Sequence, residues 1–291
     1  MPELPEVETV MRGLSAALTG RTILQALVRR PNLRFPFPAR FAARLAGQRF
    51  QGFTRRAKYI LAELASGEVL LIHLGMSGRI SIVPAAGRMA SLGEFYDDQP
   101  ASAGEGAHDH VVLELDDGAR MIYTDPRRFG AMDLFPAGHT AEHRLLANIG
   151  VEPLGNGFHA AFLSQEFAGK KAPIKAALLD QSIIAGLGNI YVCEALHRAG
   201  IAPETPAGAI KSARLEALVR HIRDILDEAI RAGGSTLRDH AQTDGSAGAF
   251  QQRFLVYDRE GEPCARAGCK GVVARLVQSN RSTFHCPKCQ R

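Results

Sequence analysis

Residues 110–125 read HVVLELDDGARMIYTD and show the pattern that recurs through the first half of the chain. Two runs rich in β-branched and apolar residues flank Asp117-Gly118, a dipeptide that favours a tight turn between paired strands. Ser66-Gly67 separates two further runs in the same way. We therefore predict an antiparallel sheet over residues 22–134, folded as a sandwich or a barrel. The other runs are TILQALVRR at 22–30, YILAEL at 59–64, VLLIHLGM at 69–76 and AMDLF at 131–135.

A helix is predicted before these strands. Within residues 6–20 (EVETVMRGLSAALTG) apolar side chains recur at helical spacing, and Gly20 supplies a stop. Residues 84–107 are rich in Gly, Ala, Ser and Pro and have no periodicity, which predicts an irregular surface loop. The apolar helix positions are Val7, Val10, Met11, Leu14 and Leu18.

The pattern becomes helical after Gly150, and 291 residues exceed the roughly 100 to 200 residues usual for one domain. We therefore predict a second, helical domain, then a glycine-marked loop over 234–250 and short strands over 251–291. The predicted helices lie near 159–168, 172–182, 188–199 and 212–232, and the last ends at Gly233-Gly234.

Charge and hydropathy indicate the class of partner. No run approaches the roughly 18 consecutive apolar residues of a membrane helix, and the acidic, proline-marked start is unlike a signal peptide. We expect a cytoplasmic protein with no membrane partner. The formal charge is +5, and the excess lies in residues 253–291, where eight Lys or Arg face three Asp or Glu. This tail suits an anionic partner such as DNA, and a merely solubilising tail is the alternative.

Four of the five cysteines follow the spacing C-x4-C-x16-C-x2-C at Cys264, Cys269, Cys286 and Cys289. Two close pairs on two turns resemble a zinc ribbon, because a soft tetrathiolate set suits tetrahedral zinc. We predict one structural Zn²⁺ and no organic cofactor. A pair of disulfides is the alternative, and it conflicts with an intracellular location. Cys193, on an apolar helical face, is expected to be a buried core thiol.

Pro2 follows Met1, and a small second residue permits removal of the initiator methionine. The exposed α-amino group would titrate near roughly 7.7 to 8.0, so a neutral fraction could attack an electrophilic carbon. Attack at the anomeric carbon of a deoxyribose would expel the base and leave an iminium that permits β-elimination. The neighbouring Glu3 could protonate the sugar ring oxygen. From these two residues alone, a plain helix cap is the simpler interpretation.

Six separated segments together resemble the formamidopyrimidine-DNA glycosylase and endonuclease VIII family. Their order and spacing cover nearly the whole chain. They are MPELPEVET at 1–9, RRAKYIL at 55–61, HLGMSGR at 73–79, YTDPRRFG at 123–130, GLGNIYVCEAL at 186–196 and RSTFHCPKCQ at 281–290.

The resemblance implies a multidomain α+β fold and a monomer that binds double-stranded DNA containing oxidised bases, in the cytoplasm at the nucleoid. The implied parts are a catalytic antiparallel β-sandwich with flanking helices over 1–136, a helix-two-turns-helix DNA-binding domain over 150–233, a lesion-recognition loop over 234–250, and a β-hairpin zinc ribbon over 251–291.

By matching position, the resemblance makes Pro2 the Schiff-base nucleophile and Glu3 the general acid. Lys58 would donate a proton and bind phosphate, and Arg281 would hold the phosphates beside the lesion and assist δ-elimination. Without the family, Lys58 and Arg281 would be interpreted as solvated surface charges.

The implied DNA contacts come from His108, Arg127, Lys171 and Asn189. Asn189 stands at a helix start, where backbone N–H groups bind phosphate. Met76, Arg127 and Phe129 would fill the gap left by an everted nucleotide. Strand core is the alternative interpretation for Met76 and Phe129.

Residues 233–251 look like the loop that covers 8-oxoguanine in the formamidopyrimidine branch, and Arg127 in PRRFG would face the orphaned cytosine. The loop and the arginine both favour oxidised purines over oxidised pyrimidines as substrates. We therefore predict a bifunctional glycosylase and AP lyase of base excision repair that acts by β,δ-elimination. The chain departs from the family pattern in two places: the 84–107 segment is longer than the family usually carries, and Ala249 stands where an aromatic residue is common. Alternatives are an endonuclease VIII-like activity on oxidised pyrimidines and a non-catalytic zinc-ribbon DNA-binding protein.

Overall fold

The structure, a computed structural model, describes residues 2–85, 105–235 and 248–291. The chain divides into two compact units. The N-terminal unit comprises Met1–Ala147 and Ala232–Ala249, and the C-terminal unit comprises Asn148–Arg231 and Phe250–Arg291. Most of the predicted loops at 84–107 and 234–250 lies outside the described residues. Among the helices of the described part, none combines the length and the apolar character required to span a bilayer.

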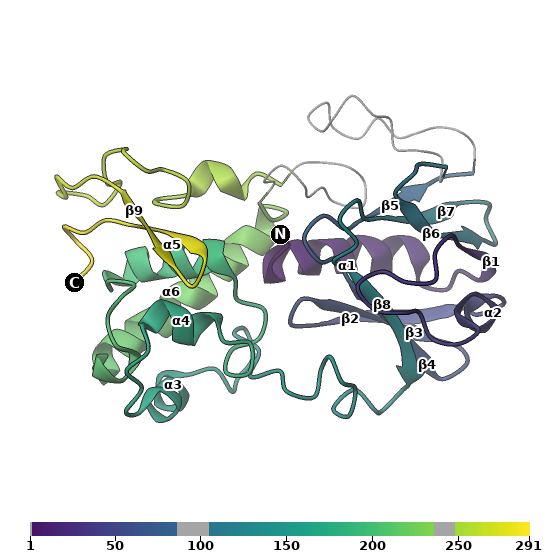
Figure 1. The fold of residues 1–291 in the computed structure, drawn as a ribbon, viewed down its shortest axis with the longest axis horizontal. Coiled ribbons are helices and arrows are strands. Elements are labelled where there is room, and N and C mark those ends of the chain that lie inside the picture. The colour runs from purple at the N-terminus through teal and green to yellow at the C-terminus, as the bar shows by residue number, and fades with distance from the viewer. Residues whose placement is uncertain (1, 86–104, 236–247) are drawn as a thin grey trace. The chain divides into compact units, whose positions relative to one another are not determined.

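The N-terminal unit is a sandwich of two four-stranded antiparallel sheets (Figure 1). This confirms the predicted antiparallel β fold and, of the two arrangements that the strand pattern left open, the sandwich that the family resemblance implied. One sheet has the order β1-β6-β7-β5, formed by β1 (Ile23–Val28), β6 (Asp109–Leu115), β7 (Arg120–Thr124) and β5 (Arg79–Val83). The other has the order β2-β3-β4-β8, formed by β2 (Phe50–Arg56), β3 (Tyr59–Leu64), β4 (Glu68–His73) and β8 (Ala131–Pro136).

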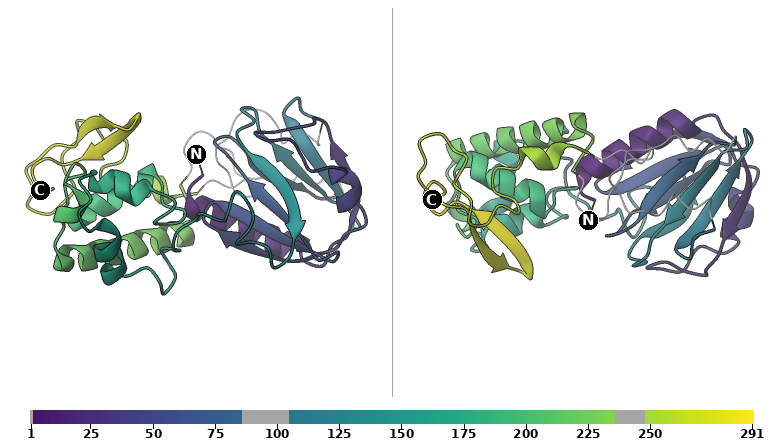
Figure 2. Two further views of the ribbon diagram at one scale, coloured as in Figure 1. Left: turned by 60° about the horizontal axis from the view of Figure 1, so that its bottom comes forward. Right: turned by 90° about the horizontal axis from the view of Figure 1, so that it is seen from above.

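Helix α1 (Leu4–Leu18) runs alongside the sandwich and contributes to the same core as both sheets (Figure 2). The short helix α2 (Phe41–Leu45) adds Phe41 and Leu45 to that core. The predicted periodicity of α1 is confirmed, since its apolar positions face the strands and each one removes apolar surface from water. Val7, Val10, Leu14 and Leu18 are fully buried, and Met11 packs against them partly buried.

Two turns join the sheets at the same place. Residues 74–78 link β4 to β5, and residues 125–130 link β7 to β8. β4 pairs with β8 at His73↔Ala131, while β5 pairs with β7 at Arg79↔Thr124. Because both turns connect the same two strand pairs, they run side by side.

The C-terminal unit is helical, with one hairpin. The predicted helices are present, since α3 (Ala160–Phe167), α4 (Ile174–Leu179), α5 (Asn189–Ala199) and α6 (Ser212–Arg231) lie at the expected positions. Two 3₁₀ turns, η1 (Ala207–Ala209) and η2 (Phe250–Arg253), accompany them. The hairpin pairs β9 (Ala274–Gln278) with β10 (Arg281–His285). Cys193 of α5 is buried against Val256, Val273 and Phe284, which confirms the core-thiol interpretation.

Candidate active site and metal-binding cluster

The start of α1 carries the two residues predicted to act as nucleophile and acid. Pro2 and Glu3 are both buried, and Glu3 is the N-cap of the helix. The backbone N–H of Glu3 donates to Oε2 of Glu6 at 2.9 Å. This reciprocal capping geometry is common where a glutamate stands three residues after the cap, and it holds the first turn in place.

Glu6 also binds a distant segment of the same unit, a role that the sequence reasoning missed. Its Oε1 accepts from the backbone N–H and from the hydroxyl of Ser235, at 2.8 and 2.9 Å. Ser235 is the last described residue before 236–247. Ser235 also bridges Ala249, so the two ends of the predicted lesion loop meet beside the start of α1. The glutamate spacing of a capping box was the available signal.

Lys58 lies in the tight turn between β2 and β3, after Ala57 in the left-handed region at φ 52°. The Arg55 guanidinium stabilises this turn by donating to the carbonyl of Ala57 at 2.8 Å. Arg55 also donates to Oε2 of Glu8 on α1, at 2.8 Å. The turn that carries Lys58 and the helix that follows Pro2 are therefore tied together through one largely buried arginine, whose side chain is 10% exposed.

His73, at the end of β4, lies within the electrostatic influence of Lys58 and was not predicted as a site residue. Its ring packs against the Tyr59 ring at a tilt of 36° with centroids 4.8 Å apart, and its Nδ1 accepts from the N–H of Gly75 at 3.2 Å. Burial, followed by the charges of Lys58 and Arg34, lowers the pKa of His73 to about 4. The ring is therefore neutral at physiological pH, with its proton on Nε2.

Met76 lies on the β4–β5 turn, and Arg127 and Phe129 lie on the β7–β8 turn beside it. The strand-core alternative for Met76 and Phe129 is wrong, because neither belongs to a strand and the Phe129 side chain is 45% exposed. The Arg127 guanidinium stands over the Phe129 ring at 4.9 Å, a cation–π contact. His108, in the turn before β6, is exposed, and its carbonyl accepts from the N–H of Asp125.

In the C-terminal unit, Asn189 is the first residue of α5, as predicted, and follows the N-cap Gly188. Its Nδ2 donates to the carbonyl of Ser282 at 2.9 Å. Its Oδ1 is buried with no hydrogen-bond partner among the described residues. Lys171 is exposed just before α4.

Arg281 begins β10 and is exposed beside the hairpin turn, where Ser279 and Asn280 both have positive φ. Lys175 of α4, 1% exposed, anchors the first half of β10 beside this turn. Its Nζ donates to the Ser282 carbonyl at 3.2 Å and to Oγ1 of Thr283 at 2.5 Å. The sequence reasoning missed Lys175, although a lysine on the apolar face of a short helix was a visible signal.

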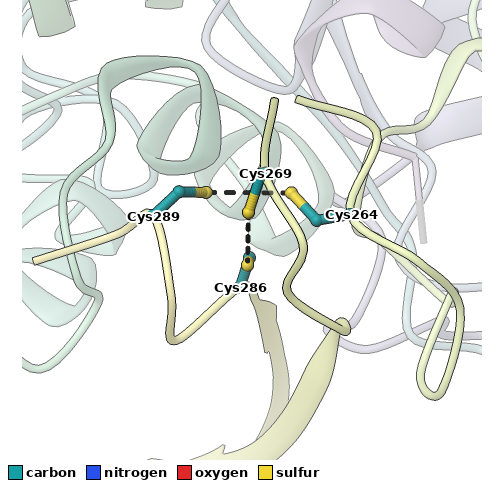
Figure 3. Close-up of side chains that lie close together, drawn as sticks. All are labelled: Cys264, Cys269, Cys286 and Cys289. Atoms are coloured by element: carbon teal, nitrogen blue, oxygen red, sulfur yellow. Dashed lines mark hydrogen bonds between the residues drawn. The ribbon is translucent and has the colours of Figure 1, made fainter. Parts of the chain in front are cut away.

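The four clustered cysteines point toward one another from two turns (Figure 3). All four sulfurs lie within 4.8 Å of one another, and Cys264–Cys289 and Cys269–Cys286 are each 3.7 Å apart. Sulfurs at about 2.3 Å from a tetrahedral ion would lie about 3.8 Å apart, so the set fits a metal ion. No cysteine is in a disulfide, so the disulfide alternative is wrong.

Two groups support the cluster electrostatically. Burial raises the pKa of the Cys286 thiol, but hydrogen bonds from the backbone N–H groups of Cys289 and Lys288, together with the neighbouring cysteine side chains, outweigh it and bring the pKa to about 7. His197 of α5 places Nε2 3.3 Å from the Cys264 sulfur, a contact that was not predicted. Burial, then the charges of Arg266 and Arg198, lowers the pKa of His197 to about 4, so its neutral ring can donate to a thiolate.

Comparison with known proteins matches both units. The formamidopyrimidine-DNA glycosylase N-terminal domain model matches residues 1–132, and the formamidopyrimidine-DNA glycosylase H2TH domain model matches residues 149–241. A Cereibacter sphaeroides protein named formamidopyrimidine-DNA glycosylase is 58% identical over 291 residues, covering 100% of both chains.

Two solved structures share the fold over the whole length. A mutant of Lactococcus lactis FPG, in complex with DNA containing Fapy-dG, has a TM-score of 0.86 at 32% identity and covers 100% of both chains. The MutM (FPG) protein from Thermus thermophilus has a TM-score of 0.83 at 37% identity, covering 99% of this chain and 98% of its own.

Proposed function

Because the chain belongs to the formamidopyrimidine-DNA glycosylase family, we propose that it is a bifunctional DNA glycosylase and AP lyase of base excision repair. It removes oxidised purines, 8-oxoguanine and formamidopyrimidines, from double-stranded DNA and nicks the strand by β,δ-elimination. The observation that carries the proposal is the buried Pro2-Glu3 pair at the start of α1, tied through Glu8 and Arg55 to the turn of Lys58.

The reaction begins at the nitrogen of Pro2 after removal of Met1. This secondary amine attacks C1′ of the damaged nucleotide, the glycosidic electron pair leaves with the base, and the proton that the attacking nitrogen loses neutralises the departing base. Glu3 protonates the sugar ring oxygen, which opens the ring and gives an iminium between Pro2 and C1′. The iminium acidifies the C2′ hydrogens, so loss of one proton expels the 3′ phosphate. A second elimination then expels the 5′ phosphate.

Two cationic side chains assist the elimination steps in which phosphate leaves. Lys58 donates a proton and binds phosphate, and Arg281 holds the phosphates that flank the lesion and promotes the δ step. His108, Lys171 and Asn189 contact the DNA backbone. Asn189 retains a second amide N–H for this contact, since one is already used on Ser282.

Met76, Arg127 and Phe129 fill the gap left by the everted nucleotide, and Arg127 faces the orphaned cytosine. The exposure of Phe129 and its contact with Arg127 support this proposal, because an apolar side chain already in solvent can replace lost base stacking.

The metal held by the four cysteines is one structural Zn²⁺, and no organic cofactor takes part. The donor set supports zinc because four thiolates saturate a tetrahedral ion and leave no position for substrate. The ion would supply folding energy to the ribbon that presents Arg281, and no chemistry.

We assign one proposed function to each part of the chain, in sequence order. Residues 1–136 form the catalytic domain, 150–233 the helix-two-turns-helix DNA-binding domain, 234–250 the lesion-recognition loop and 251–291 the zinc-ribbon module. The protein acts as a monomer on the DNA of the nucleoid, in the cytoplasm.

Borohydride trapping tests the nucleophile directly. The protein is incubated with a duplex containing one 8-oxoguanine opposite cytosine, reduced, digested and mapped by mass spectrometry. We expect the DNA adduct on the N-terminal peptide that starts at Pro2. An adduct on Lys58, or none, would contradict the mechanism, and faster excision of thymine glycol than of 8-oxoguanine would contradict the purine preference.

A further inference from the structure

Asp125 is a fully buried carboxylate at the end of β7 that none of the proposed chemical steps uses. Three donors converge on it. Its Oδ1 accepts from the hydroxyl of Ser77 at 2.7 Å, and its Oδ2 accepts from the N–H of Gly130 at 2.8 Å and from the hydroxyl of Tyr123 at 3.4 Å. Burial, followed by the charge of Asp125, holds the pKa of Tyr123 well above its usual range, so this hydroxyl stays a donor.

Ser77 connects the same carboxylate to both turns. It is buried and directly follows Met76 on the β4–β5 turn. While its hydroxyl donates to Asp125, its oxygen accepts from the backbone N–H of Arg127 at 3.2 Å. A continuous hydrogen-bond chain therefore runs from Arg127 through Ser77 to Asp125, and it links the backbones that carry Met76, Arg127 and Phe129.

The two turns are packed too closely to adjust independently. A Cβ atom on Gly75, whose φ is +63°, would lie 2.4 Å from both the backbone N of Gly130 and the backbone carbonyl carbon of Phe129. Arg128 has φ 56°, a conformation that costs a non-glycine residue free energy and persists only where its surroundings impose it. The Asp125 contacts supply that constraint, because the carboxylate accepts directly from the N–H of Gly130 after Arg128 and is linked through the Ser77 hydroxyl to the N–H of Arg127 before it.

We propose that Ser77 and Asp125 are positioning residues that fix Met76 relative to Arg127 and Phe129, and that they thereby set the discrimination between cytosine and adenine opposite the lesion. The inference rests on the proposed function. Its physical basis is that a side chain reading a base edge must be held within fractions of an ångström, while Arg127 and Phe129 are exposed and cannot be held by packing.

The discriminating variant is Ser77→Ala, which removes the bridging hydroxyl and leaves every proposed catalytic and DNA-contacting side chain in place. Asp125→Asn serves as the second variant, since an amide keeps the shape but replaces one acceptor oxygen by a donor. Thr124→Val is the matched control. It removes another buried hydroxyl–carboxylate bond, Thr124 Oγ1 to Asp109 Oδ1 at 2.6 Å, that does not join the two turns.

Three rates are measured for each protein under single turnover: excision of 8-oxoguanine opposite cytosine, excision opposite adenine, and strand cleavage at an abasic site in single-stranded DNA. The last substrate has no opposite base and no stack to fill. For Ser77→Ala we expect excision opposite cytosine to fall about tenfold, the effect of one charge-assisted hydrogen bond. The cytosine-to-adenine ratio should fall with it, while single-strand cleavage stays within about twofold. Asp125→Asn should shift the ratio in the same direction.

An unchanged cytosine-to-adenine ratio in Ser77→Ala would overturn the inference while leaving the proposed function intact. A parallel fall of all three rates, or an equal shift of the ratio in Thr124→Val, would also overturn it, because the effect would then be one of stability. Failure of the unaltered protein to excise 8-oxoguanine would instead reject the proposed function, and the inference with it.

Discussion

Replacing one cysteine of the cluster separates metal binding from chemistry. Cys269→Ser removes one of four thiolates that converge within 4.8 Å. Structural zinc in small fingers contributes about 10–16 kcal/mol at neutral pH, so one ligand of four accounts for about 3 kcal/mol, or about two orders of magnitude in metal affinity. Cys286 also loses its nearest sulfur neighbour, because the Cys269 sulfur that is removed lies 3.7 Å from it.

The consequence for DNA follows from where the cluster lies in the chain. Cys286 directly continues β10, which begins at Arg281, so loss of the metal frees the end of that strand. Since Arg281 is proposed to bind phosphate, we expect duplex affinity at 0.1 M salt to fall at least about tenfold on chelation. The thermal transition of the N-terminal unit should not change, because every cluster cysteine belongs to the other unit.

Zinc affinity is measured by competition with a chromogenic chelator, and DNA affinity by fluorescence anisotropy. Cys193→Ala is the matched control, because Cys193 is a cysteine of the same unit that packs in the core outside the cluster. Its zinc affinity should stay within about threefold of the unaltered protein, since no ligand is removed. Equal zinc affinity in Cys269→Ser and Cys193→Ala, or full DNA affinity after chelation, would refute the reasoning.

Three further predictions concern single side chains. The pKa of His73 is lowered to about 4 in the folded protein, so as pH falls the unfolded chain binds a proton at this residue before the folded chain does. The free energy of unfolding should therefore decrease as pH falls from about 6.5 toward 4. Two-dimensional NMR should show a neutral ring down to about pH 4, and Lys58→Ala should raise that pKa; a ring that titrates near 6.5 would contradict both points. Phe129→Ala should leave the Tm within about 1 °C because the ring is 45% exposed, yet slow excision from duplex DNA; a stability loss typical of a core phenylalanine, about 3–5 kcal/mol, would show that the ring is structural. Arg281→Gln should reduce the slope of log affinity against log salt by about 1 and lower the ratio of δ- to β-elimination product on gels, and an unchanged slope would exclude a phosphate contact.

Local sequence pattern was sufficient wherever a feature depends on neighbouring residues. The apolar spacing within residues 6–20 predicts the helix that the structure shows as α1, because a helix places every third or fourth side chain on one face. The short cysteine spacings predict the cluster because each close pair needs only one turn to offer two sulfurs to one ion. Both were predicted without knowledge of any distant partner, and both are confirmed.

Tertiary structure decided what depends on residues far apart in the chain. The strand pattern by itself left sandwich and barrel open, and only the family resemblance implied the sandwich. The runs named within residues 22–134 did not include β2 and β5. Strand order is a non-local choice that a period of two does not encode. Lys175 meets Thr283 across 108 residues, and Ser77 meets Asp125 across 48. A buried charge or hydroxyl is tolerated only where a hydrogen-bond partner lies within reach. That partner is brought into place only when the strands and helices pack.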